Sequence, residues 1–211
     1  ARLQQHRERA AQTFKTVFSG LSALLFPICT LLIILAPTIV DTVLGPKWAG
    51  TAPVIRVLAL VSMIGTFGEV TVPIFNGFGH PEKVTLIEAV QSLLIILFVW
   101  SFTTRWGLVG AALGWLPTAI VSQLVSMYLI RKLLPEALSL IGRPLFVITL
   151  ATAAAGVVAL LINAAAPTLA GLLAATITAV SVFGLIVWLT DMRLKLGLLA
   201  DVAAMVPQIT F

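Results

Sequence analysis

Six long apolar runs, separated by short segments rich in proline, glycine and charge, dominate the pattern of this 211-residue chain. A helix that crosses a hydrocarbon core of roughly 30 Å needs about 20 apolar residues, because lipid offers the backbone no hydrogen-bond partners. The runs predict transmembrane helices at 16–39, 54–75, 84–103, 108–129, 145–164 and 169–189. We therefore expect an all-α integral membrane protein with about six transmembrane helices.

The connecting segments divide the chain into five parts. The pattern predicts a cytoplasmic basic segment (1–15), a four-helix portion (16–130), a cytoplasmic loop (131–144), two additional transmembrane helices (145–190) and a cytoplasmic tail (191–211). Helix breakers such as Gly45-Pro46, Gly79-His80-Pro81 and Gly107 fall between the runs. The chain opens in a basic stretch without an initiator methionine or a signal-peptide pattern, so we expect a fragment of a longer protein.

Composition favours a bilayer over water. Hydrophobic residues make up 60% of the sequence and charged residues 10%, whereas a soluble domain is about half apolar and a quarter charged. The net charge of +5 would suit a nucleic-acid binder, but the basic residues stand between apolar runs and not among stacking aromatics. We expect the lipid bilayer as a partner and no nucleic acid.

The placement of the basic residues predicts an orientation. Ten of the 13 Lys and Arg residues fall on one side of the predicted bundle, and the positive-inside rule makes that side cytoplasmic. Both termini are then expected in the cytoplasm. The ten are Arg2, Arg7, Arg9, Lys15, Lys83, Arg131, Lys132, Arg143, Arg193 and Lys195, and the other three are Lys47, Arg56 and Arg105.

Signatures of catalysis are missing from the sequence. It contains no His-Glu-x-x-His pair, no phosphate-binding Gly-x-x-x-x-Gly-Lys loop and no Gly-x-Ser-x-Gly elbow. The two histidines, His6 and His80, lie in connecting segments, and the single cysteine, Cys29, stands in an apolar run, where a buried structural role is expected. We expect no enzyme within this chain, no catalytic residue, no cofactor and no metal.

Polar residues inside the second predicted helix are the first candidate for function. Ser62, Thr66, Glu69, Pro73 and Asn76 recur every three to four residues, so they share one helix face. A carboxylate near the bilayer centre costs a few kcal/mol, and one that persists usually faces a bundle interior or an aqueous path. The stripe predicts either a polar seam between helices or the lining of a cavity.

Three more polar residues are candidates for the same path. Arg56 begins the second helix, where it could extend to the interface or bind an anion with its planar guanidinium group. Glu88 and Gln91 stand one turn apart in the third helix, near the cytoplasmic interface, where solvation is the simpler explanation. The candidate substrate path therefore comprises Arg56, Ser62, Thr66, Glu69, Asn76, Glu88 and Gln91.

Small residues and prolines predict the packing. Gly110 and Gly114 form a small-xxx-small pattern that lets two helix backbones approach closely. Pro27, Pro37 and Pro117 fall inside predicted helices, where each removes a backbone hydrogen bond. Broken helices are common in transporters, although membrane helices in general tolerate proline.

Residues 1–132 resemble the C-terminal part of bacterial polysaccharide flippases. The resemblance rests on the order of Gln4-Gln5-His6-Arg7-Glu8-Arg9, Phe26-Pro27, Leu35-Ala36-Pro37, Leu44-Gly45-Pro46-Lys47-Trp48, Ala52-Pro53-Val54-Ile55-Arg56-Val57-Leu58, Asn76-Gly77-Phe78-Gly79-His80-Pro81-Glu82-Lys83 and Gly107-Leu108-Val109-Gly110-Ala111-Ala112-Leu113-Gly114. These Wzx-like proteins belong to the multidrug/oligosaccharidyl-lipid/polysaccharide exporter superfamily. The last two predicted helices add only hydrophobicity to the match.

The resemblance implies a two-lobed transporter of the bacterial inner membrane, of which this chain would be the C-terminal portion and an N-terminal lobe would be the partner. It also implies the substrate, an oligosaccharide on an undecaprenyl pyrophosphate carrier, which alternating access moves from the cytoplasmic to the periplasmic leaflet. Two alternatives stay open. A multidrug or other ion-coupled exporter should carry a dedicated acidic ion site, and a membrane-embedded enzyme of polysaccharide assembly should carry clustered acids or histidines in its extracytoplasmic loops.

Overall fold

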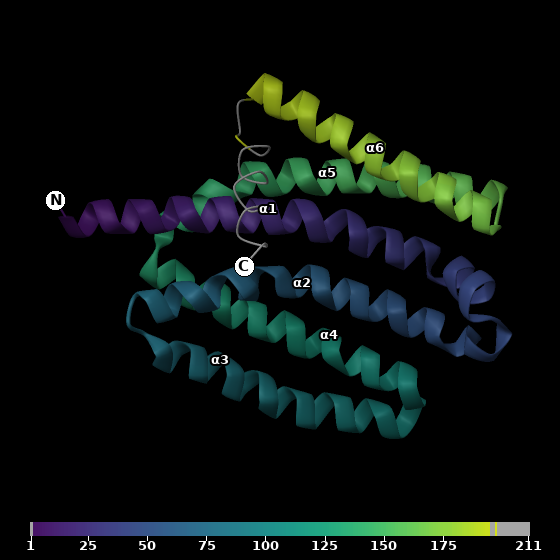
Figure 1. Cartoon of the computed structure of the whole chain (residues 1–211). Helices are drawn as coiled ribbons and strands as arrows, with labels where there is room; N and C mark the ends of the chain where they lie inside the picture. The colour runs from purple at the N-terminus through teal and green to yellow at the C-terminus, as the bar shows by residue number, and fades with distance from the viewer. Residues whose placement is uncertain (1, 195–196, 198–211) are drawn as a thin grey trace, which may run out of the picture.

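The computed structural model of the chain describes residues 2–194 and Gly197, and these form helices and short turns without a strand (Figure 1). The α-helices in this part of the chain are α1 (Arg2–Ile39), α2 (Ala52–Gly77), α3 (Pro81–Leu94), α4 (Trp100–Leu133), α5 (Pro135–Ala165) and α6 (Leu169–Leu194). A π-helical turn η1 (Val40–Leu44) and a 3-10 turn η2 (Pro46–Thr51) join α1 to α2, and a π-helical turn η3 (Ile95–Val99) joins α3 to α4. The predicted all-α class is confirmed.

Five helical segments of the described residues are long and apolar enough to cross a membrane: Arg7–Leu44, Pro46–Gly77, Pro81–Leu133, Pro135–Ala165 and Leu169–Arg193. The third has 53 residues, which would reach about 80 Å if it were straight. It reverses instead at Gly107, whose φ of 58° and ψ of −136° suit glycine, and its two limbs run side by side (Figure 1). A count of six spans requires that each limb crosses the membrane.

The helices extend furthest past the predicted apolar runs at two places. α1 begins at Arg2, so it includes nearly all of the predicted basic segment, and α5 begins at Pro135, so residues 135–144 of the predicted loop are helical. The reason is packing, since buried Ala11, Phe14, Ala137 and Ile141 belong to one apolar cluster that holds both extensions. Residues 195–196 and 198–211 of the predicted tail lie outside the described residues.

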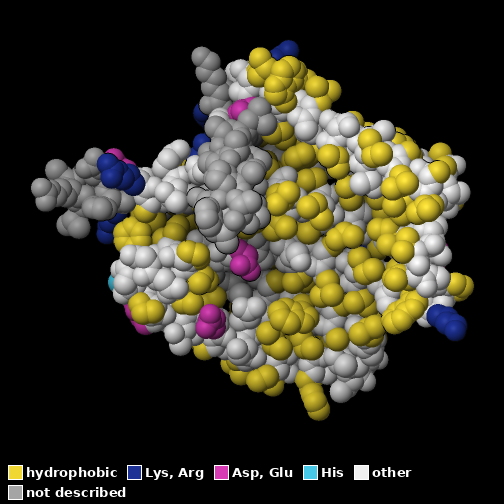
Figure 2. All heavy atoms as spheres, viewed as in Figure 1, with side chains coloured by type: hydrophobic (Ala, Val, Ile, Leu, Met, Phe, Trp, Pro, Cys, Tyr) yellow, Lys and Arg dark blue, Asp and Glu magenta, His cyan; other side chains and the backbone are white. Residues whose placement is uncertain are grey.

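The bundle has two sides, which meet at α1. On one side α1 packs on α5 and α5 on α6, and on the other α1 packs on α2, α2 on α4, and α4 on α3 (Figure 1). We call them the α1–α5–α6 side and the α2–α3–α4 side. Hydrophobic side chains cover much of the face seen in Figure 2, with basic side chains at its periphery, as expected for a surface that faces lipid.

The helices of the two sides are held together by different kinds of side chain. Near the start of α1, the rings of Phe14 and Phe18 pack edge-on against Phe67 of α2, with centroids 5.5 and 5.8 Å apart. On the α1–α5–α6 side, alanines of α5 and α6 pack against Leu35 of α1, and the clustered alanines are Ala155, Ala159, Ala175 and Ala179. Small side chains let helices approach closely where apolar burial gives no drive for association within lipid.

The glycines that open the second limb of the hairpin make the expected close approach. A Cβ on Gly114 would lie 2.7 Å from the Cα of Val99, and one on Gly110 would collide with the backbone of Phe102. Since backbone atoms cannot move aside as a side-chain tip can, both positions require glycine. The predicted close approach of two helix backbones at Gly110 and Gly114 is confirmed.

Candidate functional site

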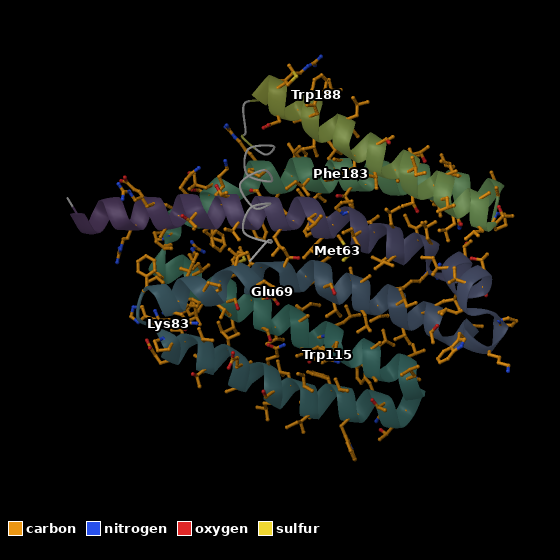
Figure 3. All side chains as sticks on the ribbon, viewed as in Figure 1. Met63, Glu69, Lys83, Trp115, Phe183 and Trp188 are labelled. Atoms are coloured by element: carbon orange, nitrogen blue, oxygen red, sulfur yellow. The ribbon has the colours of Figure 1, made fainter. Side chains whose placement is uncertain are left out.

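A polar cavity of about 750 Å³ opens between α2, α3 and α4. Five of the seven predicted path residues line it, namely Ser62, Thr66, Glu69, Glu88 and Gln91. Three polar residues of α4 complete the lining, and these are Ser122, Gln123 and Ser126. Glu69 of α2 and Trp115 of α4, which also lines the cavity, are labelled in Figure 3. The helices therefore gather eight polar side chains around one space within an apolar bundle.

The polar residues of α2 line the cavity together because they share one helix face. The hydroxyls of Ser62 and Thr66 donate to the carbonyl oxygens of Leu58 and Ser62, at 3.0 and 3.1 Å. Their hydrogens are thus engaged within the helix, while their oxygen lone pairs stay available to a ligand or water. Of these residues, Thr66 is buried and Ser62 is exposed.

Glu69 provides two acceptor groups, its side-chain carboxylate and its backbone carbonyl oxygen. Its side chain is exposed and has no hydrogen-bond or ion-pair partner in the part of the chain that the structure describes. Pro73, one turn further along, lacks an N–H and cannot donate to the carbonyl oxygen of Glu69. Since both residues line the cavity, a carboxylate and a carbonyl oxygen without its helical donor come from the same turn of α2.

The two predicted residues of α3 face the same space. Ile87 is buried in the apolar cluster that fixes the first turns of α3, and this anchor leaves Glu88 and Gln91 on the cavity wall. Glu88 is exposed and Gln91 is half-buried. Acidic groups therefore reach the cavity from two helices, Glu69 from α2 and Glu88 from α3.

The contribution of α4 to the cavity was not predicted from the sequence. Ser122 and Ser126 are 4% and 1% exposed, and Gln123 lies between them in the chain. The signal was present, because Thr118, Ser122 and Ser126 recur every four residues in an apolar helix, as the polar residues of α2 do. A serine is a weak signal by itself, and only the folded hairpin brings this face of α4 opposite α2.

Arg56 and Asn76 lie outside the lining of this cavity. The Nε of Arg56 donates to the carbonyl oxygen of Ile33 in α1, at 2.9 Å. This carbonyl lacks its usual helical donor, because Pro37 stands four residues later and has no N–H. Arg56 thus satisfies a backbone group that a proline left unpaired.

Asn76 lies exposed at the end of α2, where its backbone carbonyl oxygen accepts a hydrogen bond from the backbone N–H of Gly79 at 3.1 Å.

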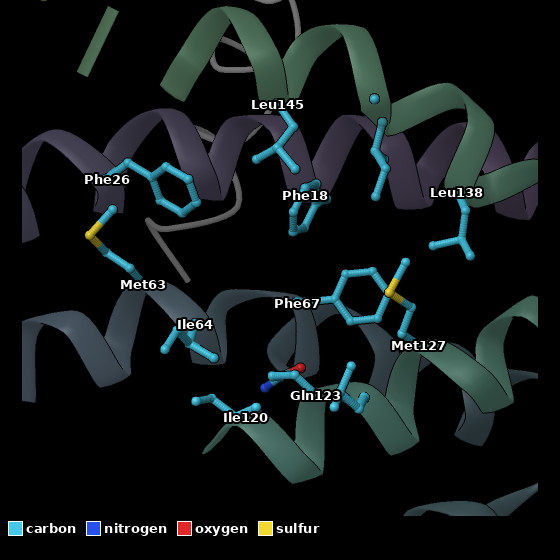
Figure 4. A pocket seen from close by; sticks show the side chains of 13 residues that line it. Phe18, Phe26, Met63, Ile64, Phe67, Ile120, Gln123, Met127, Leu138 and Leu145 are labelled. Carbon is cyan, nitrogen blue, oxygen red and sulfur yellow. The ribbon is translucent and has the colours of Figure 1, made fainter. Parts of the chain in front are cut away.

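A second cavity, of about 510 Å³, lies between α1, α2, α4 and α5 and is apolar (Figure 4). Phe18, Phe26, Met63, Phe67 and Met127 give it an aromatic and thioether wall. Gln123 lines both cavities, and Figure 4 shows its amide at the edge of the apolar one. One residue therefore stands between a polar and an apolar space.

Groups of metal ligands are not found in the described part of the chain, where no three His, Cys, Asp or Glu residues lie close enough to hold an ion. Cys29 is buried in α1. His80, at the turn before α3, forms a hydrogen bond of 2.8 Å through Nδ1 with the carboxylate of Glu82, and both side chains are partly exposed. This pair lies at the start of α3, and neither residue lines the polar cavity.

Comparison with known proteins points to polysaccharide biosynthesis. Residues 1–53 match a family described as "Polysaccharide biosynthesis protein". The chain is 30% identical over 135 residues to an "Uncharacterized membrane protein in cps region" of Klebsiella pneumoniae, which covers 63% of this chain and 27% of the relative. It is 25% identical over 108 residues to an uncharacterized membrane protein of Methanocaldococcus jannaschii, which covers 51% of this chain and 21% of the relative.

These matches confirm the predicted similarity to polysaccharide biosynthesis proteins over residues 1–53, and they add a similarity to two membrane proteins, one of them from a cps region. Together with the five membrane-length helical segments, they identify a multi-pass membrane protein. The chain spans between a fifth and about a quarter of the length of the curated relatives it matches. No solved structure matches it.

Proposed function

We propose that this chain forms part of a flippase that moves an undecaprenyl-pyrophosphate-linked oligosaccharide across the bacterial inner membrane. Export would proceed by alternating access, from the cytoplasmic to the periplasmic leaflet, in the assembly of lipopolysaccharide or exopolysaccharide. The observation that carries the proposal is the polar cavity between α2, α3 and α4. The similarity to polysaccharide biosynthesis proteins supports the choice of substrate.

The physical case begins with the cost of the crossing. A sugar headgroup carries many hydroxyls, and each one that loses its hydrogen bonds in hydrocarbon costs a few kcal/mol. The cavity offers hydroxyl, amide and carboxylate groups from three helices, and its volume falls within the range of small-molecule binding sites. The carrier's apolar tail can remain in the bilayer, so only the headgroup needs a polar path.

The proposal includes the topology. Six spans result if both limbs of the hairpin at Gly107 cross the membrane, and the start of α1, the α2–α3 turn and the α4–α5 junction then lie at one end of the bundle (Figure 1). The positive-inside count makes that end cytoplasmic, with both termini. An N-terminal lobe would face the cavity as the second half of the transporter. No catalytic step, metal or cofactor is assigned to the chain.

Cysteine labelling in whole cells tests the topology. Cysteines at Lys47 and Arg105, which lie at the opposite end of the bundle from the α2–α3 turn, should react with an impermeant maleimide. Cysteines at Lys83 and Arg143 should react only after the cells are opened. The reverse pattern would invert the orientation.

The function is tested at Glu69, in the full-length protein expressed in a flippase-deficient host. Glu69→Gln should preserve insertion and abundance, because the amide keeps the shape and much of the hydrogen bonding, yet reduce glycan export. Glu69→Leu should reduce export further, since an apolar side chain in the path offers the headgroup no partner. Glu136→Gln is the matched control, as Glu136 is an exposed acid at the start of α5 away from the cavity.

Export by the two Glu69 variants distinguishes a substrate path from a packing seam between helices. Lower export from both Glu69 variants at normal abundance, with normal export from Glu136→Gln, supports the path. Wild-type export from both Glu69 variants at matched abundance would remove Glu69 from the mechanism. If the stripe were a packing seam, leucine would replace the ionisable side chain of Glu69 at little cost to stability or with a gain.

The apolar cavity favours a second candidate function, the export of lipophilic aromatic drugs. Aromatic and methionine side chains adapt to varied apolar ligands, and Phe18, Phe26, Met63, Phe67 and Met127 surround this space. Efflux of ethidium from cells that express the full-length protein distinguishes the two functions. A drug exporter should lower ethidium accumulation without restoring glycan export, whereas the proposed flippase should do the opposite.

A further inference from the structure

Two neighbouring side chains of α4 carry buried polar atoms without a partner in the described part of the chain. These atoms are the Oγ of Ser122 and the Oε1 of Gln123. Both residues line the polar cavity, and Ser122 is 4% exposed. A buried polar atom left unsatisfied is unfavourable by about 1–3 kcal/mol. A group that persists in this state beside a cavity is positioned for a ligand.

The hydroxyl of Ser122 differs from its neighbours in the same helices. Thr118, one turn earlier in α4, donates to the carbonyl oxygen of Gly114 at 3.1 Å, and Ser62 and Thr66 of α2 donate within their own helix in the same way. A serine or threonine hydroxyl in a membrane helix usually forms this local hydrogen bond. Ser122 does not use it, so both its donor and its acceptor capacity are available.

The amide of Gln123 is held in place by α2. Its Nε2 donates to the carbonyl oxygen of Gly65 at 3.3 Å, across the contact between α4 and α2. Gly68 provides the room, because a Cβ there would lie 2.9 Å from Nε2 and 3.4 Å from Oε1. With Nε2 engaged, the orientation of the amide is fixed and Oε1 is the atom left free to accept.

We propose that Ser122 and Gln123 form a subsite that recognises a hydroxyl group of the sugar in the polar cavity. A sugar hydroxyl donates to the Oε1 of Gln123, and the Oγ of Ser122 donates to or accepts from the same sugar. The inference rests on the proposed flippase function and deepens it, because it assigns selectivity for a glycosylated over an unglycosylated carrier to α4.

The chain provides its own control. Ser19 and Ser22 of α1 and Thr152 of α5 also have buried hydroxyls without partners in the described residues, but none of them lines either of the two cavities. An unpaired hydroxyl by itself is therefore no indication of a ligand. What distinguishes Ser122 is its place on the cavity wall beside the fixed amide of Gln123.

The test compares two probes in nanodiscs that hold the full-length protein: undecaprenyl pyrophosphate and the same lipid carrying one N-acetylglucosamine. Binding is followed by tryptophan fluorescence, since Trp115 lines the cavity. The wild type should bind the glycosylated lipid more tightly. Ser122→Ala and Gln123→Met should each reduce this preference about fivefold, the value of one neutral hydrogen bond, while Ser22→Ala leaves it unchanged.

Thermal unfolding of the same variants guards against misfolding. Ser122→Ala removes an unsatisfied buried hydroxyl, so its melting temperature should equal or exceed that of the wild type. An unchanged preference in both Ser122→Ala and Gln123→Met would overturn the subsite and leave the flippase function intact. Failure of the wild type to bind either lipid would overturn the proposed function, and the subsite with it.

Discussion

The two sides of the bundle pack their helices in different ways. On the α1–α5–α6 side, alanines at the contact bring the helices together, and Ala159 and Ala175 are fully buried. On the α2–α3–α4 side, serine, glutamine and glutamate line a cavity of about 750 Å³. Both sides expose large apolar side chains, such as Leu93 of α3 and Leu161 of α5. The inward side chains therefore form a closed alanine contact on one side and a polar cavity on the other.

α4 contains both solutions within one helix. Near Gly107 its glycines pack directly on the first limb of the hairpin, and two to three turns later Ser122 and Ser126 line the cavity. The two limbs are therefore in close backbone contact at one end, at Gly110 and Gly114, which we call the clamp. Toward the other end they separate. If this contrast is correct, substitutions at the clamp should damage folding, and those at the cavity should damage function alone.

The largest effect is expected at the clamp. Gly114→Leu and Gly110→Leu should each lower the free energy of unfolding by more than about 3 kcal/mol, because the new side chain meets backbone atoms of Phe98, Val99 or Phe102. The folded yield after detergent extraction and size-exclusion chromatography measures the loss. Gly184→Leu in α6 is the control, since a Cβ there meets nothing within 4 Å. Normal yield of both clamp variants would show that the hairpin contact is absent.

A smaller effect is expected at the corresponding glycine of the α1–α5–α6 side. Gly156→Leu in α5 meets the Cγ2 of Thr30 and the Cδ1 of Ile34, where a Cβ would lie at 2.9 and 3.3 Å. These are the ends of side chains, which can turn aside, so we expect a loss of about 2 kcal/mol. The midpoint of thermal unfolding should fall less than for Gly114→Leu. A greater fall than at Gly114 would reverse the ranking of the two contacts.

The smallest effect concerns the link between the two sides at Arg56. Arg56→Met should cost about 1 kcal/mol, because the carbonyl oxygen of Ile33 loses its donor. In a Pro37→Ala background the new backbone N–H can bond to Ile33, so the same substitution should cost almost nothing. A double-mutant cycle on unfolding free energies measures this coupling. Equal costs in the two backgrounds would show that Arg56 does not replace the donor that Pro37 lacks.

Much of the fold could be predicted from the sequence, because apolar runs of membrane length have few alternatives to the helix. The turn at Gly107 was placed correctly by its breaker residues, and the stripe of α2 by its period. The extensions of α1 and α5 were missed because they depend on one apolar cluster, whose members Phe14 and Ile141 lie far apart in the chain.

The candidate site was predictable in part for the same reason. Periodicity identifies the polar face of one helix, but not which faces meet. Glu69 and Gln91 therefore came from the sequence, while Ser122 and Gln123 required the folded hairpin. The contact of Arg56 joins residues 23 positions apart and depends on a proline. A single polar residue does not reveal such a partner.

The central claim is that the cavity of the α2–α3–α4 side is wet and the α1–α5–α6 side is dry. The most direct measurement compares Ser122→Cys with Ser22→Cys in a protein whose other cysteines, including Cys29, are replaced by alanine. The two serines are 4% and 0% exposed, and the hydroxyls of both lack a partner in the described residues, so burial alone predicts equal protection. A small water-soluble methanethiosulfonate reagent modifies thiolates that water can reach. The account predicts rapid modification at position 122, close to the rate for Glu69→Cys, and protection at position 22. Equal protection of both positions, or faster modification at position 22, would contradict it.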